Sequence, residues 1–99
     1  MLLSYFLLPL FHDRLLHQGL LLQTRVTLIG RPDCHLCDEA RKTITNVCNE
    51  LNVGWEELSI LDNPKLADQY FELIPVTLVD GLPHDQWKVD PDRLRKALS

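Results

Sequence analysis

Two cysteines separated by two residues carry the most specific chemical signal in the chain. Cys34 and Cys37 stand in the run Cys34-His35-Leu36-Cys37. If this run begins a helix, both cysteines lie on one face, close enough for a disulfide. Cys34 would sit at the helix N-terminus, where free N–H groups and the helix dipole stabilise a thiolate and lower its pKa. The spacing predicts reversible thiol–disulfide exchange, with Cys34 attacking a substrate disulfide and Cys37 resolving the mixed disulfide.

The charged residues around the pair have opposite effects on the thiolate of Cys34. His35 favours the thiolate when it is protonated, whereas Asp33, Asp38 and Glu39 disfavour it. We therefore expect a mildly reducing couple rather than a strong oxidant.

A metal site and an inert thiol pair are the alternatives to redox chemistry. Structural zinc takes four ligands, usually two such pairs or one pair with spaced histidines. Here there is one pair, and apart from His35 the only histidine after residue 23 is His84. The sequence therefore favours redox chemistry, and we predict no bound metal.

A strand followed by a helix is expected to hold the pair in place. Residues 25–29 are apolar and β-branched and end in a Gly-Arg-Pro-Asp turn, which predicts a strand. Residues 34–51 carry apolar side chains at spacings of three and four, the stripe of an amphipathic helix. Cys48 falls on this stripe about 16 Å along the helix from Cys37. Because a disulfide needs Cα atoms within about 7 Å, Cys48 cannot form one with Cys37 while the helix is intact. Its position on the apolar stripe predicts a core residue.

The rest of the chain predicts further elements of both kinds. Three more strands are expected, at 55–60, 76–79 and, after an Asp80-Gly81 hairpin turn, at about 85–89. Two more helices are expected, one opening at Asn63-Pro64 with Phe71 on its buried side and one over 91–98 behind an Asp90 cap. The order β-α-β-α-β-β-α predicts an α/β fold, a mixed four-stranded sheet with helices on both faces.

Composition narrows the function classes. The chain has 99 residues, enough for one globular domain, which we place at residues 24–99. A net charge of −4 with scattered basic residues argues against nucleic-acid binding, and pairs such as Arg41-Lys42 look like solvated helix faces. Three cysteines are too few for a disulfide framework, which favours a reducing compartment and a cytoplasmic location.

Residues 1–23 form an apolar, leucine-rich extension of uncertain structure. Its longest apolar run spans residues 2–11, short of the roughly 20 residues that cross a membrane. The basic start and small-residue cleavage site of a signal peptide are missing. An extra helix, a weak membrane-surface anchor and upstream sequence from a misplaced start all remain open. We assign no function to the extension and expect no membrane contact through it.

Two segments resemble the glutaredoxin branch of the thioredoxin superfamily. Residues 28–37 are similar to its strand–turn–active-site segment, and Ile74-Pro75-Val76 resembles its cis-proline element. Residues 24–99 in particular resemble small uncharacterised glutaredoxin-like proteins that combine a CHLCDEA-type motif, a PVxxVDG segment and a tryptophan before the last helix, here Trp87. The resemblance implies a thioredoxin-like fold.

The resemblance also implies roles for four residues near the cysteines. Pro75 would be cis, and Ile74 would expose its backbone to an extended peptide or glutathione. Arg31 would contact a substrate carboxylate, and His35 would line the substrate site. One departure weakens glutathione as the partner, because residues 87–90 replace the Gly-Gly pair of glutathione-using glutaredoxins and their side chains crowd the site.

These observations lead to one main hypothesis and two alternatives. The main one is a glutaredoxin-like thiol–disulfide oxidoreductase that acts, as a monomer, on disulfide-containing proteins or low-molecular-weight disulfides. It would have no resident cofactor, with glutathione or another low-molecular-weight thiol as a candidate co-substrate. The alternatives are a thioredoxin-fold binding or adaptor module without redox turnover, and a cysteine-ligated metal or iron–sulfur carrier.

Overall fold

The computed structural model describes residues 23–99. Its elements follow the predicted order: β1 (Thr24–Gly30), α2 (His35–Leu51), β2 (Gly54–Ser59), α3 (Pro64–Tyr70), β3 (Val76–Val79), β4 (Leu82–Gln86) and α4 (Pro91–Leu98). Residues 1–22, which make up nearly all of the predicted extension, lie outside the described residues. Among residues 23–99, no helix is long and apolar enough to cross a membrane.

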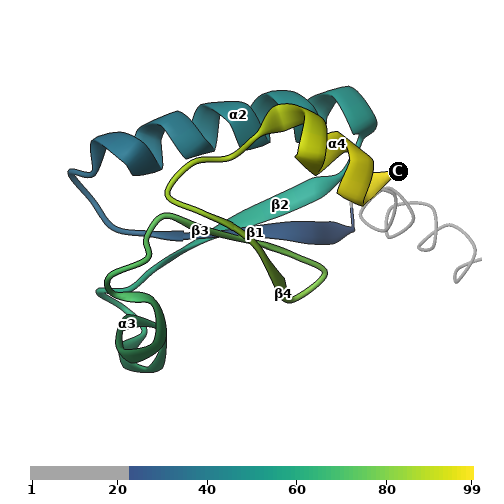
Figure 1. Ribbon diagram of the computed structural model, residues 1–99. Coiled ribbons are helices and arrows are strands. Elements are labelled where there is room, and N and C mark those ends of the chain that lie inside the picture. The colour runs from purple at the N-terminus through teal and green to yellow at the C-terminus, as the bar shows by residue number, and fades with distance from the viewer. Residues whose placement is uncertain (1–22) are drawn as a thin grey trace, which may run out of the picture.

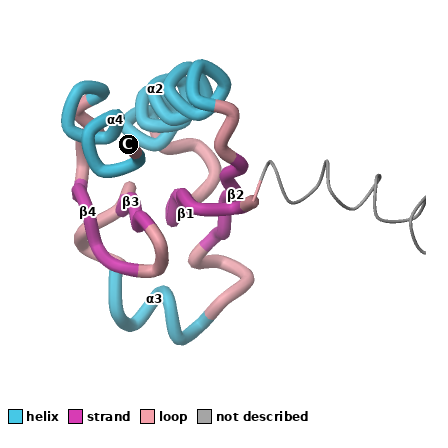
Figure 2. The backbone as a smooth tube through the Cα atoms, turned by 90° about the vertical axis from the view of Figure 1, so that its right-hand side faces the viewer, coloured by secondary structure: helices cyan, strands magenta, loops and turns pink. Residues whose placement is uncertain are grey.

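The strands form one mixed sheet in the order β2-β1-β3-β4. β1 pairs with β2 in parallel and with β3 antiparallel, and β3 pairs with β4 antiparallel. Helices α2 and α4 cover one face of this sheet, and α3 lies against the other (Figures 1 and 2). The predicted α/β architecture with helices on both faces is therefore confirmed.

The main core lies between the sheet and the helices α2 and α4. The apolar stripe of α2 faces the sheet, as its spacing predicts. The buried members of this core are Val26, Leu28, Ala40, Ile44, Val47, Cys48, Val79, Leu94 and Leu98. α2 ends at Leu51, because the next residue, Asn52, has a left-handed backbone (φ 57°) that stops the helix. The helix that carries the cysteine pair is thus held along its length by the core.

A smaller core on the other face holds α3, and here one prediction is wrong. Ile29, Ile60 and Val76 are buried against α3. Phe71, predicted on the buried side of the helix, is 61% exposed. The reason is that Phe71, the C-cap of α3, keeps a helical backbone (φ −41°, ψ −46°), which turns its side chain about 100° around the helix from that of Tyr70, away from the core. Leu73 and Ile74, in the turn that follows, pack against the core again.

The predicted Asp80-Gly81 turn of the β3–β4 hairpin is confirmed, but the start of β4 differs from the prediction. Asp80 and Gly81 both have positive φ (51° and 83°), the backbone of a two-residue hairpin turn. β4 therefore begins directly at Leu82, three residues before the predicted start at 85. Pro83 is tolerated inside β4 because β4 is an edge strand, and the pairing with β3 is irregular at His84.

Candidate active site

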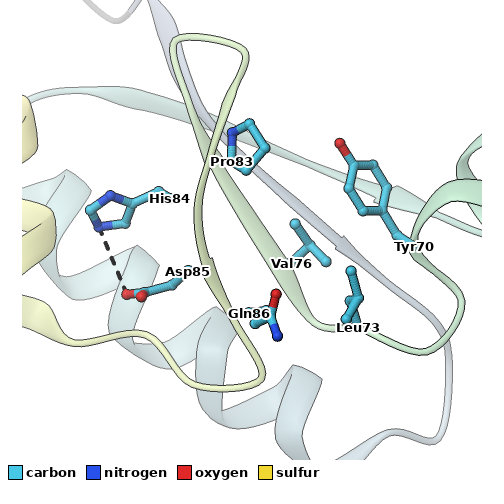
Figure 3. A pocket seen from close by; sticks show the side chains of 7 residues that line it. All are labelled: Tyr70, Leu73, Val76, Pro83, His84, Asp85 and Gln86. Carbon is cyan, nitrogen blue, oxygen red and sulfur yellow. Dashed lines mark ion pairs between the residues drawn. The ribbon is translucent and has the colours of Figure 1, made fainter.

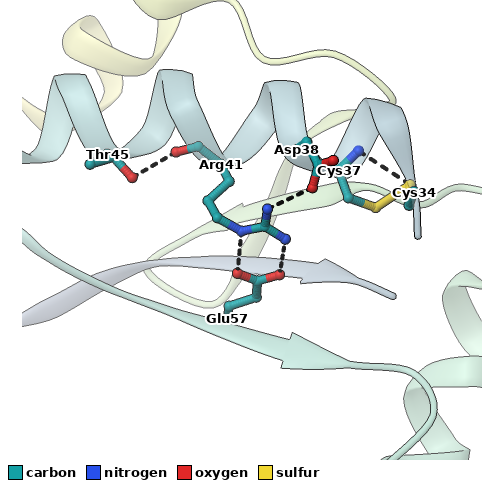
Figure 4. Close-up of polar contacts among 6 residues, drawn as sticks. All are labelled: Cys34, Cys37, Asp38, Arg41, Thr45 and Glu57. Carbon is teal, nitrogen blue, oxygen red and sulfur yellow. Dashed lines mark hydrogen bonds and ion pairs between the residues drawn. A yellow bond between two sulfur atoms is a disulfide. The ribbon is translucent and has the colours of Figure 1, made fainter. Parts of the chain in front are cut away.

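Cys34 and Cys37 form a disulfide at the start of α2, with Cα atoms 5.1 Å apart. Cys34 is the N-cap of the helix: its Sγ accepts a hydrogen bond from the backbone N–H of Cys37 at 3.2 Å (Figure 4). Its carbonyl accepts the first helical hydrogen bond, from the N–H of Asp38 at 3.1 Å. The sulfur of Cys34 thus takes the place of the oxygen that usually caps a helix. The same N–H would stabilise a thiolate after reduction.

The two sulfur-bearing residues differ in exposure. Cys34 is half-buried, whereas Cys37 is fully buried. The sulfur of Cys37 lies against the backbone of β1, since a Cβ atom built on Gly30 would come within 2.9 Å of it. Of the two, Cys34 is the one that an incoming disulfide can approach. The sequence marked Gly30 only as the end of a strand, and its packing role was missed.

The segment before β3 brings a proline to the end of β1 against which Cys37 packs. The Ile74–Pro75 peptide bond is cis, as the resemblance implied. Ile29 pairs with Val76, so Pro75 lies across from Gly30, against which Cys37 packs. Arg31 is exposed in the turn between β1 and α2, and His35 is exposed as the first residue of α2. All the predicted site residues therefore lie at one end of the sheet, and their roles stay predictions.

A shallow hollow of about 440 Å³ lies beside the disulfide, between α2 and residues 87–89. His35 and Leu36 line it from the helix, and Trp87 lines it from the loop after β4. Trp87 has a positive φ of 68°, and its backbone N–H donates to the carbonyl of Pro75 at 2.7 Å. Its indole Nε1–H donates to the carbonyl of Glu72 at 3.3 Å. Trp87 is thus held close to the proline segment, with half of its surface still exposed.

Comparison with known proteins agrees with this geometry. Residues 25–99 match the family described as Glutaredoxin-like domain (DUF836). The chain belongs to this glutaredoxin-like family. It is 29% identical over 80 residues to the uncharacterized protein Rv0508 of Mycobacterium tuberculosis, covering 76% of this chain and 82% of that protein.

Solved structures resemble the glutaredoxin-like domain in the same region. The X-ray structure of protein XcR50 from X. campestris has a TM-score of 0.61 and 30% identity, covering 74% of this chain and 93% of that one. Thioredoxin 1 from Thermosipho africanus has a TM-score of 0.54 at 12% identity, and the match covers 74% of this chain and 88% of that one. The second likeness shows that the glutaredoxin-like domain has a thioredoxin fold.

Arg41 of the glutaredoxin-like domain ties α2 to β2 one turn after the disulfide (Figure 4). Its Nε and Nη2 donate to the two carboxylate oxygens of Glu57, each at 2.7 Å, and its Nη1 donates to Asp38 at 2.7 Å. The hydrogen bonds to Glu57 and then to Asp38 raise the pKa of Arg41 above its ordinary value. Arg41 lies on a solvent-exposed helix face, as predicted, but its ion pairs, one of them with a residue of another element, were not predicted.

Cys48, the third cysteine of the glutaredoxin-like domain, is free and buried in the main core. Burial raises the pKa of its thiol to about 11. Its burial in the main core confirms the prediction that Cys48 is a core residue.

A second hollow of the glutaredoxin-like domain, of about 310 Å³, lies at β4 and the end of α3 (Figure 3). His84 and Asp85 lie on one side of the β4 ribbon and Tyr70 on the other. Asp85 forms an ion pair with Arg93, and His84 Nε2 is 3.8 Å from the Asp85 carboxylate. The predicted site residues do not line this hollow. Within residues 23–99, no group of three or more His, Cys, Asp or Glu side chains is placed to hold a metal ion.

Proposed function

We propose that the chain is a thiol–disulfide oxidoreductase that uses the Cys34/Cys37 couple. The observation that carries the proposal is the unequal placement of the two sulfurs. Cys34 is half-buried, and its sulfur accepts a hydrogen bond from the backbone N–H of Cys37 at the helix start. Cys37, the other half of the disulfide, is shielded from solvent. An accessible, stabilised thiolate next to a protected partner thiol is the arrangement that disulfide exchange requires.

The proposed reaction has two exchange steps. The Cys34 thiolate attacks one sulfur of a substrate disulfide, so that a mixed disulfide forms and the other substrate sulfur leaves as a thiolate that takes a proton. Cys37 loses its proton and attacks Cys34 Sγ, which forms the Cys34–Cys37 disulfide and releases the second substrate thiol. The substrate gains two electrons and two protons, and the dithiol protein loses them. A thiol reductant, either glutathione or another low-molecular-weight thiol, then returns the protein to the dithiol state.

The surroundings of the disulfide support protein disulfides as substrates. Leu36 and Trp87 line the hollow beside the cysteines and are 40% and 50% exposed. Large apolar side chains exposed together are typical of surfaces that contact other proteins. We propose that an extended substrate segment pairs with the backbone at Ile74, beside Pro75. Arg31 and His35 would contact its polar groups from the turn and the helix start.

Turnover of a model disulfide tests the proposal. Reduction of insulin by dithiothreitol should be faster with the full chain present, and Cys34→Ser should abolish that acceleration. Cys48→Ser is the matched control, because it also removes one thiol but lies in the core away from the disulfide. Unchanged acceleration by Cys34→Ser would refute the mechanism.

Trapping of partners tests the substrate class. Cys37→Ser leaves the mixed disulfide unresolved, so a protein substrate should stay attached until dithiothreitol releases it. Partners that bind equally well to a Cys34→Ser/Cys37→Ser variant would indicate an adaptor. Visible absorbance or stoichiometric zinc in the purified chain would indicate a metal or cluster carrier.

A further inference from the structure

Acidic side chains surround the start of α2. Asp38 follows Cys37 directly, in the first turn of the helix, and Glu57 reaches the same place from β2. A negative charge near Cys34 disfavours its thiolate, because like charges repel. Left alone, the two carboxylates would oppose the stabilisation that the helix N-terminus supplies.

Arg41 lies between these two carboxylates. Its guanidinium makes a two-bond fork with Glu57 and a third bond with Asp38, all at 2.7 Å, and its side chain is about one-third exposed. Arginine stays charged throughout the working pH range, so it offsets one of the two negative charges at every relevant pH. The cluster of Asp38, Glu57 and Arg41 thus carries one net negative charge instead of two.

We propose that Arg41 is a positioning residue that sets the reduction potential of the Cys34–Cys37 couple by offsetting the charge of Asp38 and Glu57. This inference rests on the proposed function, because it concerns the same couple. Reduction turns a neutral disulfide into a thiol and a thiolate, so whatever stabilises the thiolate stabilises the reduced form and makes the couple more oxidising. Arg41 therefore holds the couple at a higher potential than the acidic side chains alone would allow.

The test is a redox titration of the full chain against mixtures of reduced and oxidised dithiothreitol. In Arg41→Gln the cluster carries two negative charges, and the equilibrium should shift toward the disulfide by about threefold. This is the effect of one charge about 10 Å along the helix from Cys34 at an effective dielectric constant of about 50. For a two-electron couple this corresponds to about 14 mV toward more negative potential. In 1 M salt, where the Debye length is about 3 Å, most of the difference should vanish.

Charge-matched variants separate the charge of Arg41 from its mechanical role. Arg41→Lys keeps the charge but loses the planar fork, and it should stay near the wild-type potential. Asp38→Asn should shift the potential upward. The double variant Asp38→Asn/Arg41→Gln again carries one net negative charge and should return to the wild-type value. If Arg41→Lys shifts as far as Arg41→Gln, or if the double variant does not return, the charge explanation is wrong.

Arg95→Gln is the structural control. Arg95 repeats the arrangement of Arg41, because it pairs with Asp92 three residues before it and with Glu50 on another element. Glu50 lies about 24 Å along α2 from Cys34, so Arg95→Gln should leave the potential unchanged.

A wild-type chain that reaches no reversible dithiol–disulfide equilibrium would refute the proposed function itself. A normal wild-type titration that Arg41→Gln leaves unchanged would refute only the role of Arg41.

Discussion

Gly30 and Cys37 are packed so closely that a methyl group at Gly30 would lie 2.9 Å from Cys37 Sγ. Contacts this short force one of the two groups to move, and Gly30 belongs to a strand that is paired on both sides. Overpacking of this kind typically costs about 1–3 kcal/mol. We therefore expect Gly30→Ala to lower the free energy of unfolding of the reduced protein by roughly that amount, measured by urea denaturation.

A Cys37→Ala variant, which lacks the sulfur atom, is the control for this prediction. In a Cys37→Ala background the methyl group at Gly30 has more room, so Gly30→Ala should cost less than it does in the reduced wild type. The difference is the coupling energy of a double-mutant cycle. Equal costs in the two backgrounds would show that strand propensity, and not contact with Cys37, decides the effect.

The unequal exposure of the two active-site cysteines predicts unequal alkylation. In the reduced protein at pH 7, iodoacetamide should modify Cys34 at least about tenfold faster than Cys37, because only the thiolate reacts and only Cys34 is accessible. Peptide mapping by mass spectrometry after short exposures measures both rates. Faster modification of Cys37 would reverse the assignment of attacking and resolving thiols.

Cys48 should resist the same reagent. With its pKa raised to about 11 by burial, about 0.1% of the thiol is ionised at pH 8, against roughly a quarter for a free cysteine. We expect no modification of Cys48 in the native protein within the time that consumes Cys34, and rapid modification in 6 M guanidinium. The denatured sample is the control that the reagent is competent. Modification of native Cys48 at the rate of Cys34 would contradict its place in the core.

The ion pair between Arg25 and Asp80 predicts a pH-dependent contribution to stability. Arg25 Nε and Nη2 donate to the Asp80 carboxylate at 2.9 and 2.7 Å, and this hydrogen bonding lowers the pKa of Asp80. A carboxyl whose pKa is lower in the folded state stabilises the fold above its unfolded pKa, and that stabilisation is lost as the pH falls through the folded pKa. Asp80→Asn should therefore be less stable than wild type at pH 7, and the difference should shrink when the pH is lowered toward about 2.

Asparagine is the suitable replacement, because Asp80 has a positive φ of 51°, a conformation that asparagine also adopts readily. Asp68→Asn serves as the comparison, since Asp68 is exposed on α3 and is not ion-paired with any of residues 23–99. Thermal unfolding of the three proteins at both pH values measures the effect. An equal loss for Asp80→Asn at pH 2 and pH 7 would assign it to the turn backbone instead of the ion pair.

Local patterns predicted most of the elements because their causes are local. The strand before Cys34, the stripe of α2 and the Asp90 cap each depend on neighbours within a few residues. The start of β4 was predicted three residues late, since Pro83 is unfavourable inside a strand and the sequence does not show that β4 lies at the edge of the sheet, where a proline is accepted.

The candidate site was predictable only in part. The spacing of Cys34 and Cys37 marks the chemistry, and the resemblance adds Pro75. Two features were missed because each joins residues of different elements. Arg41 pairs with Glu57, sixteen residues later in the sequence, and Gly30 packs against the side chain of Cys37 on the next element. Neither contact leaves a periodic signal in the sequence. Both follow from the way α2 lies across the sheet.

The edge strand β4 also bears on how the protein behaves at high concentration. An exposed edge offers unpaired N–H and C=O groups on which a neighbouring molecule can add a strand. In β4, Pro83 has no N–H to offer, and the irregular pairing at His84 interrupts the regular spacing of the backbone groups. Both features make this edge a poor template for growth of the sheet from one molecule to the next, and so protect the protein from aggregation on that side.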